Sequence, residues 1–377
     1  MSNSDDSDRL PLAWRTRWAL GRNRVLGSAA FQSWAARMPV FQTIARRKAA
    51  RQFDLIAGFV YTQIAHVFVR TGLLPFLREG PRTASAIAAF LSFGPEATDR
   101  ILKAGAAIGL AESPQEDLWT LGETGAELSA NEGAMAMIRH HDLLYRDLAD
   151  PVAALSAGSK ADTELADFWT YAPAGACAGE AAPYSDLMRA TQPMVWRQII
   201  GRYAFSRHRR MLDIGGGSGA FAEAVGTATP KLELGIFDLP DVVPLAERRF
   251  SGSALASRVE VHAGSFHDDA LPAGYDLMTL VRILHDHDDD VAAALLANIR
   301  ESLPPGGRLL IVEPMAGTPG ARGMGDAYFG LYLWAMGSGR PRSSEANCKM
   351  LKQAGFSKTR LLPTPLPIIA SAIVASI

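Results

Sequence analysis

The chain of 377 residues has only two cysteines, Cys177 and Cys348, which lie far apart in the sequence. This spacing excludes a disulfide framework and a cysteine-rich metal site, and it favours a reducing compartment. No apolar run near the start is long enough to cross a membrane, because Gln63 and His66 interrupt the longest one, 55–69. The first residues, MSNSDDSD, are acidic and polar, which is not typical of a secretory leader. We therefore expect a cytoplasmic protein.

Negatively charged residues are missing from a long segment that follows the acidic first residues. The formal net charge is only −1, which gives no overall reason to expect a nucleic-acid partner. Between Arg9 and Gln52, however, there is no Asp or Glu, while ten Arg and Lys residues alternate with Trp14, Trp18 and Trp34. Arginines interleaved with tryptophans are typical of contact with an anionic membrane surface. Packing of this arm on a partner subunit remains the alternative.

Composition divides the chain into three regions, 1–52, 53–195 and 196–377. The first is the basic, tryptophan-containing arm. The second is predicted to be helical, because apolar residues recur every three or four positions from Ile56 to Phe68.

Later parts of the second region predict a small mixed unit. Two helices are predicted in 80–91 and 94–110, and the sequence LWTLGETG in 118–125 predicts a strand with a tight turn. Together these elements have the outline of a winged helix. The segment 157–183 is rich in small residues and is expected to be irregular.

The third region alternates strands with helix-length segments, which predicts an α/β fold with a mostly parallel sheet covered on both faces. The last two strands are joined by a short turn, so they should form an antiparallel pair at the edge of the sheet. The predicted strands are 211–215, 232–238, 258–264, 275–284, 307–313, 359–364 and 367–376.

A glycine-rich turn, MLDIGGGSGAF, follows the first of these strands. Asp213 ends the strand, and Gly215 and Gly217 lead with further glycines into a helix. Glycines allow a ligand to approach the backbone, and the helix N-terminus offers amide donors to an anionic group. The turn predicts a nucleotide-type cofactor site, and its Gly-x-Gly-x-x-Ala pattern also fits the NAD fingerprint.

Asp238 ends the second strand, where a carboxylate can bind the ribose hydroxyls of either cofactor. Leu239, Ser265, Phe266 and Arg282 complete the predicted cofactor-binding set. A dehydrogenase would more often show a Ser/Tyr/Lys set or a metal site, and neither is evident in the sequence.

The sequence VRILHDHDDD places His285 and Asp286 at the carboxyl end of the fourth strand, where ligands bind in open α/β sheets. A neutral imidazole suits removal of a proton from a hydroxyl, so His285 is our candidate general base. Glu313 ends the adjacent strand and is predicted to accept the other ring proton of His285. A metal cluster or a solvated helix cap remains an alternative for the HDHDDD segment, although His285 and His287 have no evident third ligand. A surface or capping role remains open for Glu313.

Five motifs taken together resemble the O-methyltransferases whose best-known members methylate plant phenolics: GRYAFSRHRRMLDIGGGSGAF, IFDLPDVV, LVRILHDHDDD, LPPGGRLLIVEPM and LKQAGF. The resemblance covers about 53–377. It implies a class I fold with a Rossmann-like sheet, an N-terminal winged-helix dimerisation domain, a homodimer, and S-adenosylmethionine as cofactor. Asp213, Gly215 and Gly217 would then line the cofactor, Asp238 would bind its ribose, and His285 would be the base.

The segments RRKAARQFDLIAGFVYTQI, HHDLLYRDLADPVAAL and GRPRSSEA resemble bacterial carotenoid O-methyltransferases more closely still. Those enzymes, of the hydroxyneurosporene and demethylspheroidene type, methylate the tertiary hydroxyl of acyclic carotenoids. The resemblance implies a hydrophobic small-molecule substrate, while a phenol or a polyketide remains an alternative acceptor. It also places Tyr328, Tyr332, Trp334 and Met336 on a helix that borders the substrate, although core or dimer contacts would explain them equally well.

Two departures from the family pattern stand out. Gly264-Ser265-Phe266 replaces the usual Gly-Asp-Phe, so the acid that reaches the adenine is missing. Pro341-Arg342-Ser343 stands where plant members have Glu-Arg-Thr, which leaves only Glu345 nearby. Without the glutamate of that motif, we expect a more apolar substrate pocket.

The winged-helix outline also raises the hypothesis of a DNA-binding regulator. The would-be recognition helix carries Glu96 and Asp99 beside Arg100 and Lys103, which is a poor balance for phosphates. A dimerisation role, with no nucleic-acid partner, is therefore favoured.

Overall fold

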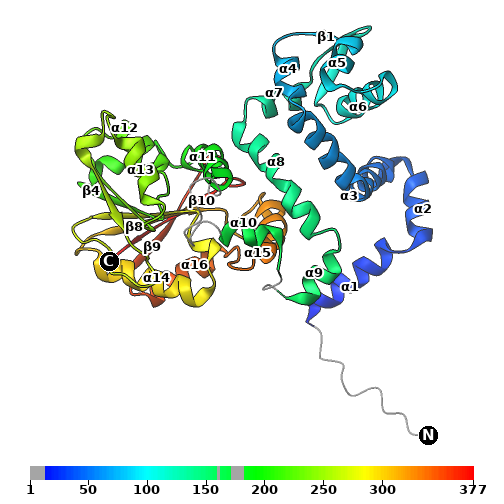
Figure 1. Ribbon diagram of the computed structural model, residues 1–377. Coiled ribbons are helices and arrows are strands. Elements are labelled where there is room, and N and C mark those ends of the chain that lie inside the picture. Colours follow the sequence, from blue (N-terminus) through cyan, green and yellow to red (C-terminus); the bar gives the residue numbers. More distant parts are fainter. Residues whose placement is uncertain (1–12, 159–161, 171–181) are drawn as a thin grey trace.

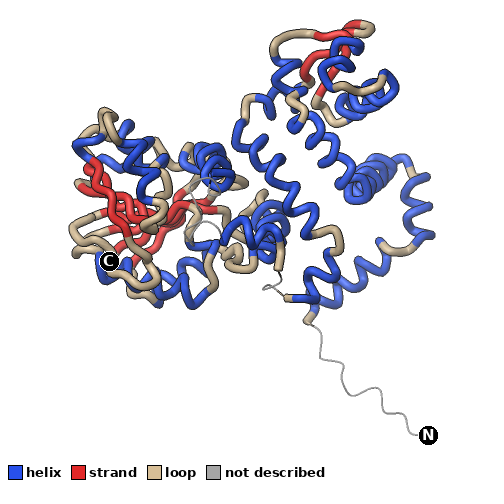
Figure 2. Tube along the Cα trace, viewed as in Figure 1, coloured by secondary structure: helices blue, strands red, loops and turns tan. Residues whose placement is uncertain are grey.

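A computed structural model describes residues 13–158, 162–170 and 182–377. A mostly helical N-terminal half lies beside an α/β unit that contains the large sheet (Figure 1). The strands concentrate in the α/β unit, and a small second group of strands lies at the far end of the helical half (Figure 2). Cys348 is a free thiol, and Cys177 lies outside the described residues.

The large sheet has seven strands in the order β6-β5-β4-β7-β8-β10-β9. All are parallel except β10, which is antiparallel to both β8 and β9. This confirms the predicted α/β fold and the antiparallel pair at its edge. The strands are β4 (Arg210–Ile214), β5 (Glu233–Asp238), β6 (Val259–Ala263), β7 (Leu277–Val281), β8 (Arg308–Glu313), β9 (Lys358–Leu362) and β10 (Ser371–Ser376).

Two apolar cores lie on the two faces of this sheet. One contains Phe221 and Val225 of α12, and the other contains Leu295 and Ile299 of α14. Each fully buried side chain of this size contributes about 1.5–3 kcal/mol. The helices of the unit are α12 (Ala220–Ala228), α13 (Val243–Phe250), α14 (Asp289–Ser302), α15 (Phe329–Met336) and α16 (Ser344–Gln353), with short 3-10 turns η1 (Phe205–Arg207), η2 (Ala256–Arg258) and η3 (Leu284–Asp286) and a π-helical turn η4 (Gly323–Tyr328).

The N-terminal half contains a three-stranded sheet in the order β1-β3-β2 and most of the helices. Its strands are β1 (Arg82–Thr83), β2 (Ala111–Gln115) and β3 (Leu118–Leu121). Its helices are α1 (Trp14–Leu26), α2 (Ala29–Arg37), α3 (Pro39–Arg70), α4 (Leu73–Arg78), α5 (Ala84–Leu91), α6 (Pro95–Ala107), α7 (Glu123–Ser129), α8 (Glu132–Asp147), α9 (Pro151–Ala157), α10 (Glu164–Thr170) and α11 (Ala182–Trp196).

The two helices and the strand hairpin expected for a winged helix are present. Thr83 caps α5 by accepting a hydrogen bond from the backbone of Ala86, and α6 begins at Pro95, which is well suited to a first helical turn. The basic residues of α6 are already paired within the helix, Arg100 with Glu96 and Lys103 with Asp99. No basic excess remains there for DNA phosphates.

Two local predictions were wrong. Part of the segment expected to be irregular forms α10, whose Leu165 is fully buried against α15. The predicted strand 275–284 ends at Val281, because Arg282 turns the backbone into the left-handed region at φ 59°. The division of the chain into three domains remains a prediction, and its first boundary falls within α3.

No described helix is long and apolar enough to span a bilayer.

Candidate active site

The glycine turn joins β4 to α12 with three left-handed residues: Gly215 at φ 68°, Gly217 at φ 57° and Gly219 at φ 76°. A Cβ on Gly215 would lie 2.4 Å from the Cδ1 of Ile283, so this position excludes any larger residue by space as well as by conformation. A Cβ on Gly217 would meet nothing within 4 Å. The backbone at Gly217 is therefore open to a ligand, as a cofactor turn requires.

Two acids flank this turn. Asp213 is buried and accepts a 2.7 Å hydrogen bond from the Thr279 hydroxyl, and burial raises its pKa to about 7. Asp238 accepts hydrogen bonds from the backbone N–H groups of Gly217 at 2.7 Å and Leu239 at 2.8 Å. Burial raises the pKa of Asp238 as well. Asp238 thus holds the backbone of Gly217 and Leu239 at the end of β5, and Asp213 of the neighbouring β4 lies near enough for the charge of Asp238 to contribute to its raised pKa.

The end of β6 carries an acid that the sequence analysis missed. The carboxylate of Asp269 accepts a 2.8 Å hydrogen bond from the backbone N–H of Ser265 and so lies against the loop where the family pattern has its acid. The Phe266 ring packs 4.7 Å from the ring of His267 and 5.2 Å from that of His287, measured between centroids. These three aromatic rings therefore lie together beside the predicted cofactor residues.

His285 lies in the 3-10 turn η3 rather than at the end of an extended strand. The two histidines of this segment contact different rings: His285 packs on Phe329, whereas His287 packs on Phe266. The His285 side chain is only 2% exposed. Its two ring nitrogens have no hydrogen-bond partner, although Nε2 lies 3.3 Å from the Oδ1 of Asp286 without hydrogen-bond geometry.

Electrostatics keep the His285 imidazole neutral. Burial and, to a smaller extent, the nearby guanidinium of Arg282 together lower its pKa to about 3. Partial burial raises the pKa of the adjacent Asp286. Near pH 7 the imidazole is an acceptor with a free nitrogen, which is the state that a general base needs.

Glu313 ends β8 and is fully buried. Its Oε2 accepts a 3.1 Å hydrogen bond from the backbone N–H of His285, so the predicted contact with the imidazole ring was wrong. Burial raises the pKa of Glu313 to about 8, which favours the neutral carboxylic acid near pH 7. Glu313 therefore holds the backbone of the turn and does not pair with the ring.

Arg282 links the site to the helical half. Its backbone N–H donates to the carbonyl of Val312, and its guanidinium donates a 2.8 Å hydrogen bond to the hydroxyl of Thr191 on α11. A left-handed conformation in a residue other than glycine costs of order 1–3 kcal/mol and is often found at functional sites. The role of Arg282 in cofactor binding remains a prediction.

The helix predicted to border the substrate does face His285. Tyr328 and Tyr332 lie on the same side of η4 and α15, with Phe329 5.6 Å from the His285 ring between centroids. Met336 is buried among apolar side chains of α10 and α15. The indole of Trp334 donates to the carbonyl of Ala154 on α9, so it contacts a different element.

Two histidines of α8 contact the tyrosines of η4 and α15, and neither was among the predicted site residues. His140 shares a 2.7 Å hydrogen bond with the Tyr332 hydroxyl, and His141 shares a 2.9 Å bond with that of Tyr328. Trp169 of α10 donates to the same Tyr332 oxygen at 3.2 Å. Burial lowers the pKa of His140 to about 4. The signals available in the sequence were the adjacent histidines at 140 and 141 and the aromatic pair at 168 and 169, which lies in a segment otherwise rich in small residues.

Among the described residues, no group of three or more His, Cys, Asp or Glu is placed to hold a metal ion. The carboxylates after His285 serve other partners: Asp288 accepts from the backbone of Gly339, and Asp289 pairs with Arg342.

The comparisons with known proteins agree with this geometry. The model of the O-methyltransferase domain matches residues 145–357. Demethylspheroidene O-methyltransferase of Cereibacter sphaeroides is 41% identical over 93% of each chain. The enzyme of the same name from Rhodobacter capsulatus is 38% identical over 90% of this chain and 85% of its own.

Solved structures show the same fold at lower identity. The pyocyanin biosynthetic protein PhzM aligns with a TM-score of 0.73 at 22% identity, over 88% of this chain and 99% of that chain. Human N-acetylserotonin methyltransferase, solved in complex with S-adenosylmethionine, aligns with a TM-score of 0.69 at 24% identity, over 87% of this chain and 97% of that chain.

Proposed function

The chain belongs to the O-methyltransferase family, and on that premise we propose that it methylates a hydroxyl of an acyclic carotenoid with His285 as general base. The observation that carries the choice of acceptor is the 41% identity to a demethylspheroidene O-methyltransferase over nearly the whole chain. The observation that carries the choice of base is the buried imidazole with two unpartnered nitrogens.

The cofactor of this family is S-adenosylmethionine, and the residues present fit it. The left-handed glycines leave open backbone at Gly217, and the carboxylate of Asp238 offers acceptors for ribose hydroxyls. Phe266 and Asp269 would border the adenine, with Asp269 in place of the missing family acid. When bound, the cofactor supplies a methyl group on a positively charged sulfur.

The low proton affinity of His285 matches a late proton transfer. An imidazole with a pKa of about 3 is too weak to ionise a free alcohol. The hydroxyl proton becomes strongly acidic as the oxygen gains its bond to the methyl group, and His285 then accepts it on the free ring nitrogen. The products would be the methyl ether, the neutral thioether that remains of the cofactor once its bond to the methyl group has broken, and the imidazolium ion, which Asp286, 3.3 Å away, stabilises.

The wall formed by α8, α10 and α15 suits a long apolar acceptor. Phe329, Tyr328, Tyr332 and Trp169 supply aromatic surface beside the base, while the neutral histidines satisfy the tyrosine hydroxyls. Within the carotenoid class we propose the tertiary hydroxyl as the acceptor. A phenol or a polyketide hydroxyl is the competing acceptor that an assay must include.

We also propose that the protein is a homodimer. The middle of α3 exposes large apolar side chains, among them Leu55 at 85% and Phe59 at 72%, and a monomer rarely leaves such a surface uncovered. A second copy is the proposed cover. A monomer by sedimentation at micromolar concentration, with Phe59→Glu behaving as the wild type, would refute this.

Helix α1 carries the proposed membrane contact. Trp14, Trp18 and Val25 follow one face of the helix at spacings of four and seven, and no residue of α1 is buried. The guanidiniums of Arg15 and Arg22 lie over the Trp14 and Trp18 rings, which suits an anionic lipid surface. Sedimentation with anionic but not neutral vesicles, lost in W14A/W18A, is expected; no difference between the two lipids would exclude this contact.

The reaction is tested with methyl-labelled S-adenosylmethionine and two acceptors, a detergent-solubilised 1-hydroxy acyclic carotenoid and a catechol-type phenol. Label on the carotenoid, detected by mass spectrometry and lost in His285→Ala, supports the proposal. Label on the phenol alone would replace the acceptor, and failure of the protein to bind S-adenosylmethionine would overturn the function itself.

A further inference from the structure

Residues 338–342 lie directly against the turn that carries His285. We propose that this segment is a clamp on the turn and that Arg342 is a positioning residue for the base. The proposal rests on the proposed role of His285 and adds the device that fixes its place.

Every backbone carbonyl of 284–287 accepts a hydrogen bond from the clamp. The Arg342 guanidinium donates to the carbonyls of Leu284 at 2.8 Å and His287 at 2.7 Å. Between these two, the carbonyl of His285 accepts from the backbone N–H of Arg340 at 2.9 Å. The carbonyl of Asp286 accepts from the hydroxyl of Ser338 at 2.9 Å. Four consecutive acceptors thus depend on one short segment, and His285 lies in their middle.

Arg342 suits this task because its fork spans both ends of the turn. The side chain is only 3% exposed, and a buried guanidinium is costly unless its charge and its donors are satisfied. Asp289, at the start of α14, supplies the counter-charge through a 2.8 Å bond from Nε. A lysine would keep the charge but could not direct donors to two carbonyls in a fixed plane.

Gly339 lets the clamp approach closely. Its φ is 78°, and a Cβ there would lie 2.3 Å from the carbonyl oxygen of His285. Its N–H donates to the carboxylate of Asp288 at 3.0 Å, which adds a contact just beyond the turn. Only glycine combines this conformation with this distance.

The clamp also connects the base to the wall proposed to face the acceptor. It follows α15 after Gly337, and α15 begins with Phe329, whose ring packs on the His285 imidazole. One continuous stretch therefore carries the wall at its start and the clamp at its end. The distance between acceptor and base is set by this stretch, and a displacement of about 1 Å can cost about 100-fold in rate.

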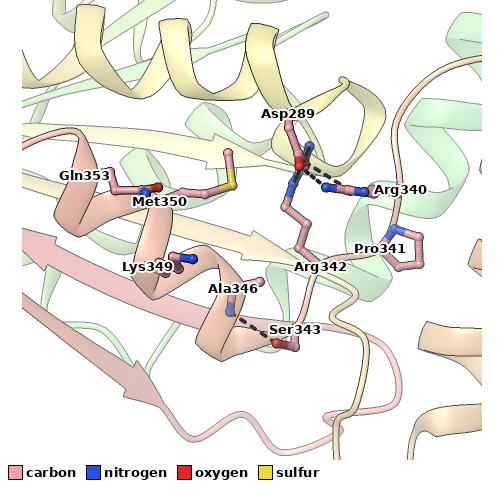
Figure 3. A pocket seen from close by; sticks show the side chains of 9 residues that line it. All are labelled: Asp289, Arg340, Pro341, Arg342, Ser343, Ala346, Lys349, Met350 and Gln353. Carbon is pink, nitrogen blue, oxygen red and sulfur yellow. Dashed lines mark hydrogen bonds and ion pairs between the residues drawn. The ribbon is translucent and has the colours of Figure 1, made fainter.

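A hollow of about 470 Å³ opens on the outer side of Arg342, between the clamp and α16 (Figure 3). Arg340 and Arg342 both reach Asp289 along its edge, and Lys349 lines it from α16. The hollow gives a small cation such as guanidinium a path to the place of the Arg342 head group. It also supplies control residues that share the surroundings of Arg342 and do not bond to the turn through their side chains.

The test compares Arg342→Ala and Arg342→Lys with Arg340→Ala and Lys349→Ala in the full-length protein. For Arg342→Ala we expect kcat to fall about 100-fold, with binding of S-adenosylmethionine by calorimetry little changed. Arg342→Lys should fold even where the alanine variant does not, and should lose about tenfold, the scale of one hydrogen bond to a charged donor. Lys349→Ala changes a side chain that lines the same hollow and makes no bond to the turn, so it should leave kcat within about twofold. Arg340→Ala removes an ion pair from Asp289 but keeps the backbone donor to His285, so its loss should be much smaller than that of Arg342→Ala.

Guanidinium chloride, added below the concentration that starts to unfold the protein, should restore part of the kcat of Arg342→Ala. Sodium chloride at the same ionic strength should not. An unchanged kcat in both Arg342 variants overturns the clamp, as does an equal loss in Arg340→Ala. Rescue by sodium chloride to the same extent also overturns it, because a general salt effect would then replace the specific head group.

A double-mutant cycle separates this proposal from the proposed function. If Arg342 acts through His285, Arg342→Ala should add almost nothing in a His285→Ala background. Full additivity overturns the clamp and leaves the base in place. A wild-type rate in His285→Ala would overturn the base, and the clamp with it.

Discussion

The two walls of the candidate site are built in different ways. On the cofactor side, the glycine turn and the acids at the ends of β4 and β5 depend on backbone conformation and on residues close in sequence, as Gly217 and Asp238 show. On the acceptor side, α8, α10 and α15 bring together side chains almost 200 residues apart, such as His140 and Tyr332. The first wall therefore tolerates change mainly at its exposed side chains, whereas the second depends on how separate helices pack.

His285 is the proposed base and packs on Phe329 of the acceptor wall, so its loss should have the largest effect. For His285→Ala we expect kcat to fall about 1000-fold, within the usual range for removal of a general base. Affinity for S-adenosylmethionine should hardly change, because the imidazole makes no hydrogen bond to the glycine turn. Single-turnover rates and calorimetry measure the two quantities. A matched loss of affinity would mean that the walls are not separable at this residue.

The acceptor wall should make stability depend on pH. The pKa of His140 is about 4 in the folded protein against an ordinary value near 6.5, so the unfolded chain binds more protons between these values. The stabilisation is complete above about pH 6.5 and is lost as the pH falls through about 4, by about 3 kcal/mol. Urea unfolding at several pH values, compared with His140→Gln, measures it. An equal slope in wild type and variant would contradict this account.

The rate of the reaction, unlike the stability, should not fall as the pH drops below 6.5. Because burial keeps the pKa of His285 near 3, the base stays unprotonated as the pH falls, and kcat should hold until the protein unfolds. A pH–rate profile under single-turnover conditions checks this, and an acid limb close to 6.5 would show a solvated base.

A substitution in the cofactor wall should change the affinity for S-adenosylmethionine and leave the rate at saturating cofactor nearly unchanged. Asp238→Asn removes a charged acceptor from the backbone of Gly217, and we expect affinity for S-adenosylmethionine to fall about thirtyfold. The rate at saturating cofactor should stay within about threefold of the wild type. Asp241→Asn, a nearby exposed acid, is the control. A large fall in the saturated rate would show that this wall also positions the reacting groups.

The smallest effect is expected from Tyr332→Phe. The change removes a hydroxyl that bonds His140 and Trp169 and should cost about 1–3 kcal/mol of unfolding free energy. Tyr203→Phe, which removes a hydroxyl bonded to His208 away from the wall, is the control. If KM for the carotenoid rises only in Tyr332→Phe, this hydroxyl also shapes the acceptor wall.

The cofactor wall was largely predictable because its signals are local. A buried strand, a glycine turn and an acid at the next strand end appear as short patterns. The structure bonds Asp238 to the backbone of Gly217 and places Asp213 close enough for the two acids to interact electrostatically. The antiparallel last strand was likewise predictable from the short turn before it.

The acceptor wall and the clamp were not predictable, because their contacts join distant segments. Nothing near His140 in the sequence indicates Tyr332, and nothing near Arg342 indicates the carbonyl of Leu284. The strand prediction also ran past Val281, because the apolar pattern continues while the left-handed Arg282 ends the strand. Asp269 escaped notice because the acid was expected at one position of the loop and folds back from four residues later.

The strained residue Arg282 has a consequence for the site as a whole. Its positive charge lowers the pKa of His140, His285, Tyr328 and Tyr332 together, although burial dominates each shift. One cation therefore sets a shared bias on where protons reside, at the proposed base and across the acceptor wall. Glycine at this position would relieve the left-handed backbone, yet it would remove the hydrogen bond to Thr191 and release that bias at every one of these groups at once.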